Sequence, residues 1–515
     1  MNKKMKNIKF IGVLGAILLA LVYSCSDNFL QDTKTDGLTG PTVYSSESTA
    51  IAALTGVYDG FQAGSQGDPG FPNEFNIKGI FRMANNVTLD WQDSGSDTEY
   101  DRLDVNPDGD VPTKMWPILY RTIGRANDVL VNIQPAIDAG NIDADLGSRL
   151  IGEALVLRAI AYQYLGGTFG GVPLMLDPLD DAFKPRDTQD AVFQQIVTDM
   201  TDAVTRLPWS YSEEKGRTTR GTAYAVLGNA HMWLGQYGEA VTAFEAIETG
   251  GVTSLEENYL DIHALANPNG KESLFEIQWA ANGDLGWNRN DEVSIWQLFS
   301  MPTDITGGGG FAGLPRKDLY DSFEAGDLRR QATVLAPGEE HPDPLINIID
   351  YDGVDINTVG TVAEPWTGNN PADRTGYWGV KGWRDPTIQG WGKAVIFGGQ
   401  NHIWIRYGEV LLSLAESALK DGQTAKAQAA FDRVRNRAWG GTAPAKTVSM
   451  DNILDEYRHE IGGEFSLWPV IRRSGEATSY MQRVKGVTIP SGHELLPLPN
   501  NALAINENLK QNDGY

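Results

Sequence analysis

Cysteine is almost absent from this chain, since Cys25 is the only one in 515 residues. A single cysteine excludes an intramolecular disulfide, and it also excludes zinc sites that need several cysteines. The fold must therefore be held together by packing. The chain is long enough to bury a large core as one big domain or as two closely joined ones.

The position of Cys25 gives it a different role. It follows four lysines, the last of them Lys9, and an apolar run over residues 10–22. This order is typical of a secretory signal, and the run is too short for a transmembrane helix. Residues 20–25 (ALVYSC) resemble a bacterial lipoprotein box, in which the thiol after the cleavage point carries diacylglycerol. We predict a signal peptide over 1–24, lipid attachment at Cys25 and a polar tether over 25–42. The alternative is a secreted protein with an unrelated cysteine.

Positive charge is also scarce. Lysine and arginine total 42 against 67 acidic residues, which gives a formal charge of -25. Removing the signal peptide takes away four lysines and no acid, which leaves -29. Such a charge argues against nucleic acids and against sulfated or uronate-rich polymers as ligands. A neutral ligand is favoured.

Catalytic motifs are missing as well. The six histidines are scattered, and neither a Gly-x-Ser-x-Gly elbow nor a His-Glu-x-x-His zinc motif occurs. The glycine run 307–310 lacks the Lys-Ser/Thr of a phosphate loop. A glycosidase needs two carboxylates, but with so many acids some suitable pair arises by chance. We therefore expect a binding protein and not an enzyme.

Helical periodicity is clear in the N-terminal half. Apolar residues recur at spacings of three and four over residues 48–61, 114–133, 145–165 and 190–207. The third of these helices is expected to break at Gly166–Gly167 and at Gly170–Gly171. Residues 62–112, rich in Gly, Asp, Asn and Pro, predict long loops.

Residues 219–248 carry a tetratricopeptide-like repeat of two helices. Six residues have the spacing of that motif, with histidine where tyrosine is usual: Tyr224, Leu227, Gly228, His231, Ala240 and Phe244. The small Gly228 and Ala240 should let the two helices approach closely. Residues 406–437 repeat the pattern more loosely.

A segment of about 250–402 separates these repeats and is far longer than an ordinary loop, which favours a functional role. It contains a strand-like piece at 273–279. We predict a mainly α fold: a tetratricopeptide-like scaffold of helical pairs (about 114–249 and 403–438) that carries a large loop-rich ligand-binding layer with few short strands. Together these parts form one domain over 43–515.

Several short motifs, in order, resemble the SusD/RagB family of lipid-anchored nutrient-binding proteins from the outer membrane of Bacteroidetes. They are residues 125–127 (RAN), 153–162 (EALVLRAIAY), 170–174 (GGVPL), 405–416 (IRYGEVLLSLAE), 433–435 (RVR) and 496–515 at the chain end. The resemblance covers essentially the whole mature chain. It departs at residues 458–469 (RHEIGGEFSLWP), where the family usually has a Phe-Glu-Gly run, so the helix there is expected to pack atypically.

The resemblance implies a cell-surface protein that captures oligosaccharides and delivers them to a SusC-like TonB-dependent barrel transporter in the outer membrane. It also implies no covalent chemistry. The alternatives are a peptide-capturing relative of the RagB kind and, less favoured, a glycoside hydrolase.

Tryptophans in polar loops are the candidate sugar-binding residues, because aromatic rings stack on sugar faces while amides, carboxylates and guanidinium groups bond the hydroxyls. Three clusters have this composition. The first contains Asn85, Asn86, Asp90, Trp91 and Gln92; the second contains Trp287, Asn288, Arg289, Asn290 and Trp296; the third contains Trp366, Trp378, Trp383 and Trp391. The first two are favoured by their position before and between the repeats. Trp116, Trp233 and Trp404 lie on periodic faces and are assigned to the core.

A candidate calcium site lies just before the 114–133 helix. Asp104, Asn106, Asp108 and Gly109 match the first half of an EF-hand loop, and Asp110 could contribute. The twelfth position is Met115 where that loop has a bidentate glutamate. The alternative is a turn capped by its own Asp and Asn side chains.

Overall fold

The structure is a computed structural model, and it describes residues 43–62, 75–92, 99–100, 103–280, 294–300, 313–336, 339–344, 346, 377–384 and 398–515. All statements below concern these residues. Within them, no helix combines the length and apolar character needed to cross a membrane.

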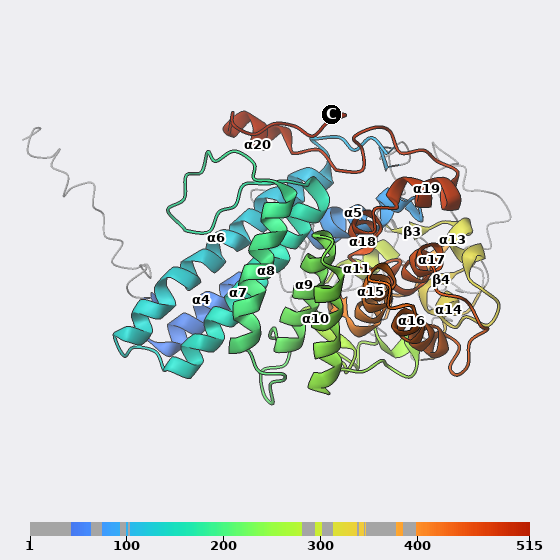
Figure 1. Cartoon of the computed structure of the whole chain (residues 1–515), viewed down its shortest axis with the longest axis horizontal. Helices are drawn as coiled ribbons and strands as arrows, with labels where there is room; N and C mark the ends of the chain where they lie inside the picture. Colours follow the sequence, from blue (N-terminus) through green and yellow to red (C-terminus); the bar gives the residue numbers. More distant parts are fainter. Residues whose placement is uncertain are drawn as a thin grey trace, which may run out of the picture.

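Antiparallel helices packed in series form the scaffold (Figure 1). The series runs through α6 (Asp110–Asp138), α7 (Ala144–Phe169), α8 (Gln189–Arg206), α9 (Arg220–Trp233) and α10 (Tyr237–Gly250). It continues with α15 (Tyr407–Lys420) and α16 (Thr424–Ala438), and α10 packs directly on α15. Although about 150 residues separate the two repeats in sequence, they form one continuous helical layer, as the mainly α prediction requires.

Close helix approach at Gly228 is confirmed. A Cβ at this position would lie 2.4 Å from the Phe244 ring, so only glycine allows α9 and α10 to meet there. Gly235 (φ +69°) and Gly422 (φ +78°) make the turns inside the two repeats, in the left-handed region that favours glycine. One prediction is wrong in part: α7 continues through Gly166 and Gly167, and it ends at Phe169, directly before the predicted break at Gly170.

The segment predicted as long loops is partly helical. Helix α4 (Glu47–Asp59), which matches the helix predicted over 48–61, packs on α6 and α7. The predicted loops after it contain the π-helix η1 (Phe75–Phe81), α5 (Arg82–Asn85) and the 3-10 turn η2 (Asn86–Thr88). Most of residues 75–91 are buried. These helical turns could not be predicted from the sequence, because they are short, lack an amphipathic stripe and lie in a segment rich in Gly, Asn and Pro.

Three two-stranded antiparallel ladders lie in the loop-rich layer. They pair β1 (Trp91–Gln92) with β3 (Leu314–Pro315), β2 (Ser273–Ile277) with β6 (His402–Arg406), and β4 (Val334–Leu335) with β5 (Trp378–Gly379). Short helices accompany them: η4 (Tyr259–Asp261), α11 (Trp296–Ser300), α13 (Lys317–Ser322) and α14 (Arg329–Thr333). The β2–β6 ladder matters most for the layout, because it brings the two ends of the insertion together.

Four helices close the chain: α17 (Met450–Ile461), α18 (Leu467–Arg473), α19 (Ala477–Lys485) and α20 (Asn500–Ile505). Helix α17 packs on α15, whereas α20 lies at one edge of the molecule, near the N-terminal half of α6 (Figure 1). The family departure at 458–469 falls on α17 and α18, and its charged residues point into the core.

Buried ion pairs join α17 to the loop-rich layer. Arg406 of β6 contacts carboxylates of Glu272 at 2.8 Å, Glu460 at 2.6 Å and Glu464 at 2.8 Å, and Lys381 also pairs with Glu464 at 2.6 Å. Burial alone would raise the pKa of Glu464, but Arg406 and Lys381 hold it well below its usual range. The charges are therefore retained in the core because each has an opposite partner.

Candidate functional site

The first predicted cluster lies in the core. The Trp91 side chain is 2% exposed, its ring meets Phe81 edge-on at 5.6 Å, and the backbone at Gly463 packs against it. Asn85 and Asn86 are also buried. The prediction that Trp91 and Asn86 form an exposed sugar-stacking surface is wrong, because the 75–92 segment folds inward against α18.

Asp90 has a structural role of the same kind. Its carboxylate is buried and accepts hydrogen bonds from the Arg458 guanidinium at 2.5–3.0 Å and from the Lys485 ammonium at 2.5 Å. Burial alone would raise the pKa of Asp90, but these two cations keep it far below its usual range. Asp90 therefore fastens the end of the 75–92 segment to α17 and α19, and its oxygens are already engaged.

The other tryptophans divide in two groups. Trp296, Trp378 and Trp383 are buried, so they too are core residues and not an exposed platform. Trp116 and Trp404 are buried as predicted, and Trp233 is partly buried. Trp287, Asn288, Arg289, Asn290, Trp366 and Trp391 lie outside the described residues, as do Cys25 and the glycine run 307–310. The sugar-binding role of the Trp287–Arg289 segment stays a prediction.

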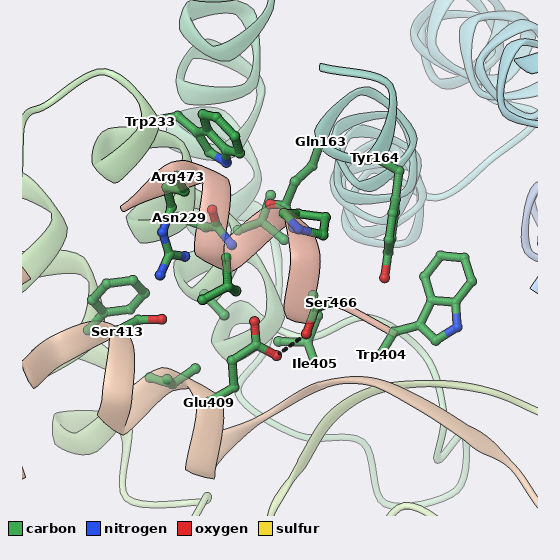
Figure 2. A pocket seen from close by; sticks show the side chains of 16 residues that line it. Gln163, Tyr164, Asn229, Trp233, Trp404, Ile405, Glu409, Ser413, Ser466 and Arg473 are labelled. Atoms are coloured by element: carbon green, nitrogen blue, oxygen red, sulfur yellow. Dashed lines mark hydrogen bonds between the residues drawn. The ribbon is translucent and has the colours of Figure 1, made fainter. Parts of the chain in front are cut away.

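An enclosed cavity lies between α7, α9, α15 and α18 (Figure 2). Its volume is about 30 Å³, and polar atoms without hydrogen-bond partners in the described chain face it from Gln163, Asn229 and Arg473. Glu409 accepts a hydrogen bond from Ser466 at 3.0 Å, and burial raises the pKa of Glu409 to about 7. Such a polar space suits one or two water molecules, and it is too small for a sugar.

A buried serine–histidine contact deserves comparison with a catalytic triad. Ser294 Oγ lies 2.7 Å from His402 Nε2, but His402 Nδ1 has no partner among the described residues. Both side chains are buried, and burial lowers the pKa of His402 well below its usual range. Without an orienting acid or access for a substrate, this pair does not form the triad arrangement.

The larger open hollow is a groove between the end of α4, the 214–217 turn and β2. Its volume is about 470 Å³, within the range of small-ligand sites. The residues that line it are Thr55, Tyr58, Asp59, Gln62, Glu214, Lys215, Gly216, Arg217, Phe275, Glu276, Ile277 and Gln278. We call this hollow the α4–β2 groove. It combines one tyrosine and one phenylalanine with amide and charged side chains.

Amide side chains organise one wall of the α4–β2 groove. Asn269 and Gln278 exchange two hydrogen bonds, at 2.8 and 2.9 Å, and Asn401 Nδ2 donates to Gln278 Oε1 at 3.0 Å. The Gln62 amide donates to the Gln278 carbonyl at 2.5 Å. These bonds fix Gln278 at the point where β2 leads toward residues 281–293.

Glu276 adds a carboxyl group without a cationic partner in this wall. Its Oε2 accepts from Asn401 Nδ2 at 2.8 Å and from the Asn269 amide at 3.0 Å, and burial raises its pKa. Gly216 (φ +94°) lies against the Gln278 amide, so the 214–217 turn can pass close to it. Beyond Gly216, a smaller hollow of about 200 Å³ continues toward Trp209.

Sequence reasoning missed Gln62 and Gln278, which line the groove, and Asn269 and Asn401, which hold Gln278 by hydrogen bonds. They belong to turns and strand ends, where no periodicity marks them. The only signal was positional, since Gln62 begins the predicted loop segment 62–112 and Gln278 lies in the strand-like piece 273–279.

The candidate calcium loop forms a turn with internal hydrogen bonds. Asn106 Oδ1 accepts from the Asp108 amide at 3.0 Å, and Asp108 Oδ2 accepts from Asn500 at 2.9 Å. Asp104 lies 3.8 Å from His493 Nδ1. In the described ranges, no three His, Cys, Asp or Glu side chains gather as metal ligands. The calcium site stays a prediction, and the turn geometry matches its alternative.

Two family models match successive parts of the chain. Residues 46–231 match the model described as "Starch-binding associating with outer membrane", and residues 271–515 match the model of the SusD family. A SusD-like protein of Bacteroides ovatus is 25% identical over 90% of this chain and 82% of its own length. SusD-like protein P2 of Formosa agariphila is 23% identical over 97% of this chain and 98% of its own.

Solved structures share the fold. A laminarin-binding SusD-like protein superposes with a TM-score of 0.72 at 24% identity, covering 92% of this chain and all of that one. Surface glycan-binding protein A from Bacteroides thetaiotaomicron, in complex with laminarihexaose, superposes with a TM-score of 0.70 at 20% identity over 91% of this chain and 99% of its own.

Proposed function

Because this chain belongs to the SusD/RagB family, we propose that it captures oligosaccharides at the cell surface and presents them to a partner for import. The protein is held in the outer membrane by a lipid on Cys25. The partner is a SusC-like TonB-dependent barrel, and the chain itself performs no covalent chemistry. The family description, which pairs starch binding with the outer membrane, supports this proposal.

The α4–β2 groove is the observation that carries the proposal. Lys215 is exposed at its rim, and Gln62 and Glu214 add polar side chains that can bond sugar hydroxyls, whereas the Gln278 amide is engaged within the wall. Tyr58, which is partly buried, adds apolar surface, whereas Phe275 is 3% exposed and belongs to the core. The enclosed cavity of Figure 2 offers no such room. The predicted contributors Trp287, Asn288 and Arg289 lie outside the described residues, and they are included in the proposal on sequence grounds alone.

Affinity electrophoresis of the protein without residues 1–25 tests the function. A panel of neutral and acidic polysaccharides is cast in the gels, and release of reducing ends is assayed in parallel. We expect retardation by a neutral glycan, with a β-glucan such as laminarin as the first choice, because one similar structure is a laminarin-binding protein and another was solved with laminarihexaose. No reducing ends should appear. Retardation by none of the glycans would favour peptide capture, and release of reducing ends would favour a hydrolase.

One groove variant and a matched control test the site. The double variant Gln62→Ala/Lys215→Ala removes two side chains at the groove, and Gln134→Ala removes an exposed glutamine on α6 as the matched control. We expect the double variant to weaken glycan binding by about tenfold or more, equivalent to about 1.4 kcal/mol. The control should bind like the wild type. Unchanged affinity in the double variant would move the site away from this groove, and Trp287→Ala then tests the neighbouring segment alone.

A further inference from the structure

An apolar patch lies on the N-terminal half of α6, outside the lining of the α4–β2 groove. Six large hydrophobic side chains are exposed in the described part of the chain, and three of them gather here. They are Leu179 (93% exposed), Phe183 (52%) and Ile505 (71%). Leu179 and Phe183 lie on the 173–184 loop and Ile505 lies on α20, and these two segments, together with α6, line a hollow of about 390 Å³. Such clustering marks an interaction surface, whereas single exposed apolar residues are ordinary.

The floor of the patch is aromatic. Trp116 and Tyr120 of α6 line the hollow with ring centroids 5.0 Å apart, and Leu509 lines it from the chain end. The stripe continues along α6 to Asn127, one helical turn before the exposed Val131. The hollow is therefore a groove that can receive a protruding apolar side chain.

The 173–184 loop is held so that its apolar side chains stay outside. Asp177 Oδ1 accepts from the Leu179 amide at 2.8 Å, and Asp181 Oδ1 accepts from the Phe183 amide at 2.9 Å. Asp180 Oδ2 accepts from the Leu176 and Asp177 amides at 2.7 and 3.1 Å. Asx turns of this kind fix local backbone geometry. The exposure of Leu179 and Phe183 is thus built into the loop.

The chain end fastens the loop from the other side. Asn506 Nδ2 donates to the Lys184 carbonyl at 2.9 Å, and Asn508 Nδ2 donates to the Phe183 carbonyl at 2.7 Å. Arg186 bonds the Lys510 carbonyl at 2.8 Å and Asn512 Oδ1 at 2.7 Å. The loop and the α20 region therefore present one preformed surface, which lowers the ordering cost of binding.

The charge around the rim of the patch indicates which kind of partner it can bind. Over residues 177–184 and 505–510 the acids Asp177, Asp180, Asp181 and Glu507 outnumber Lys184 and Lys510. Lys184 is paired with Asp180 at 2.9 Å. An acidic rim opposes an anionic membrane surface and a second copy of this acidic chain, and it favours a basic protein surface.

We propose that this patch docks the partner barrel, through a protruding apolar segment of the barrel flanked by lysine or arginine. This inference rests on the proposed function for the identity of the partner. It separates the molecule into a glycan-facing groove beside the 214–217 turn and a partner-facing patch at α20, on different parts of the scaffold.

Site-specific photo-crosslinking in the native outer membrane tests the patch. A benzophenone amino acid replaces Leu179 in the full-length chain, and Leu328, 49% exposed outside the patch, is the matched control position. We expect a light-dependent adduct with a TonB-dependent barrel, identified by mass spectrometry, from position 179 and not from 328. An adduct with lipid only, with a second copy of the chain, equally from both positions, or from neither would overturn the proposal.

The double variant Leu179→Asp/Ile505→Asp gives an independent readout. It should retain wild-type glycan retardation in gels while glycan uptake by cells falls about tenfold or more. Unchanged uptake would overturn the docking proposal. If the wild type retards no glycan but position 179 still yields the barrel adduct, the sugar assignment fails and the docking surface stands.

Discussion

Replacing Glu409 by glutamine should make the protein more stable at pH 8 and leave its stability at pH 4.5 nearly unchanged. Glu409 lies in the enclosed cavity with Ser466 as its hydrogen-bond donor, and burial raises its pKa from 4.5 to about 7. The unfolded chain releases this proton near pH 4.5, whereas the folded chain keeps it up to about pH 7. Between these values the unfolded state binds fewer protons, so stability falls as pH rises.

The magnitude follows from that interval. At 1.36 kcal/mol for each pH unit, the span from 4.5 to about 7 corresponds to about 3 kcal/mol of folding free energy. Glutamine has nearly the same shape and no ionisable proton, so the variant avoids this loss. His263 and His341, whose pKa values burial lowers to about 4, act in the opposite direction over part of the range. The difference between variant and wild type cancels their contribution.

Urea unfolding at pH 4.5, 6, 7 and 8 measures that difference. Glu239→Gln, on an exposed part of α10, is the matched control. The Glu409→Gln advantage should grow with pH and level off above pH 7. A difference that is flat with pH, or a variant less stable than the wild type at pH 8, would refute the reasoning that Glu409 is held neutral by burial.

Other substitutions test the packing, the core charges and the turn. Gly228→Ala should destabilise the protein by about 1–3 kcal/mol in urea because its Cβ would overlap Phe244, whereas Gly56→Ala, in a helix with free space, should be neutral or stabilising. Trp91→Ala should cost about 3–5 kcal/mol and lower the Tm markedly; an unchanged Tm would restore the exposed-platform interpretation. Arg406→Met should cost about 3–5 kcal/mol because three buried carboxylates each lose one partner, and a small loss would show that Lys381 on Glu464 and Arg437 on Glu272 and Glu460 compensate. EGTA should leave the Tm unchanged because Asn106 already caps its own turn; a chelator-sensitive Tm that Asp104→Asn abolishes would establish the calcium site.

The helical frame could be predicted because its signals are local. The repeat motif that contains Gly228 and Phe244 predicts both the helix pair and its closest contact. Each of the four earlier helices has a periodic stripe of apolar residues. The end of α7 was misplaced because glycines within a buried helix allow close packing, as Gly166 does against Phe193. Local composition cannot distinguish a glycine that allows close helix packing from a glycine that ends a helix.

The site was harder to predict, because burial of a tryptophan depends on distant residues. Trp91 has polar neighbours in sequence, yet its ring packs on Gly463, and the adjacent Asp90 pairs with Arg458, more than 360 residues away. The amide wall is likewise assembled from Gln62, Asn269 and Asn401, which only the β2–β6 pairing brings together. No pattern along the chain carries such long-range information.

The β2–β6 ladder has a consequence for how this protein can diversify. Ile277 pairs with His402, so the chain leaves the helical frame and re-enters it at neighbouring points. The distance between Ile277 and His402 stays the same however many residues lie between them, and lengthening a closed loop costs little free energy. The length of the intervening segment can therefore vary at little cost, provided that its buried partners, such as Lys381 for Glu464, are retained.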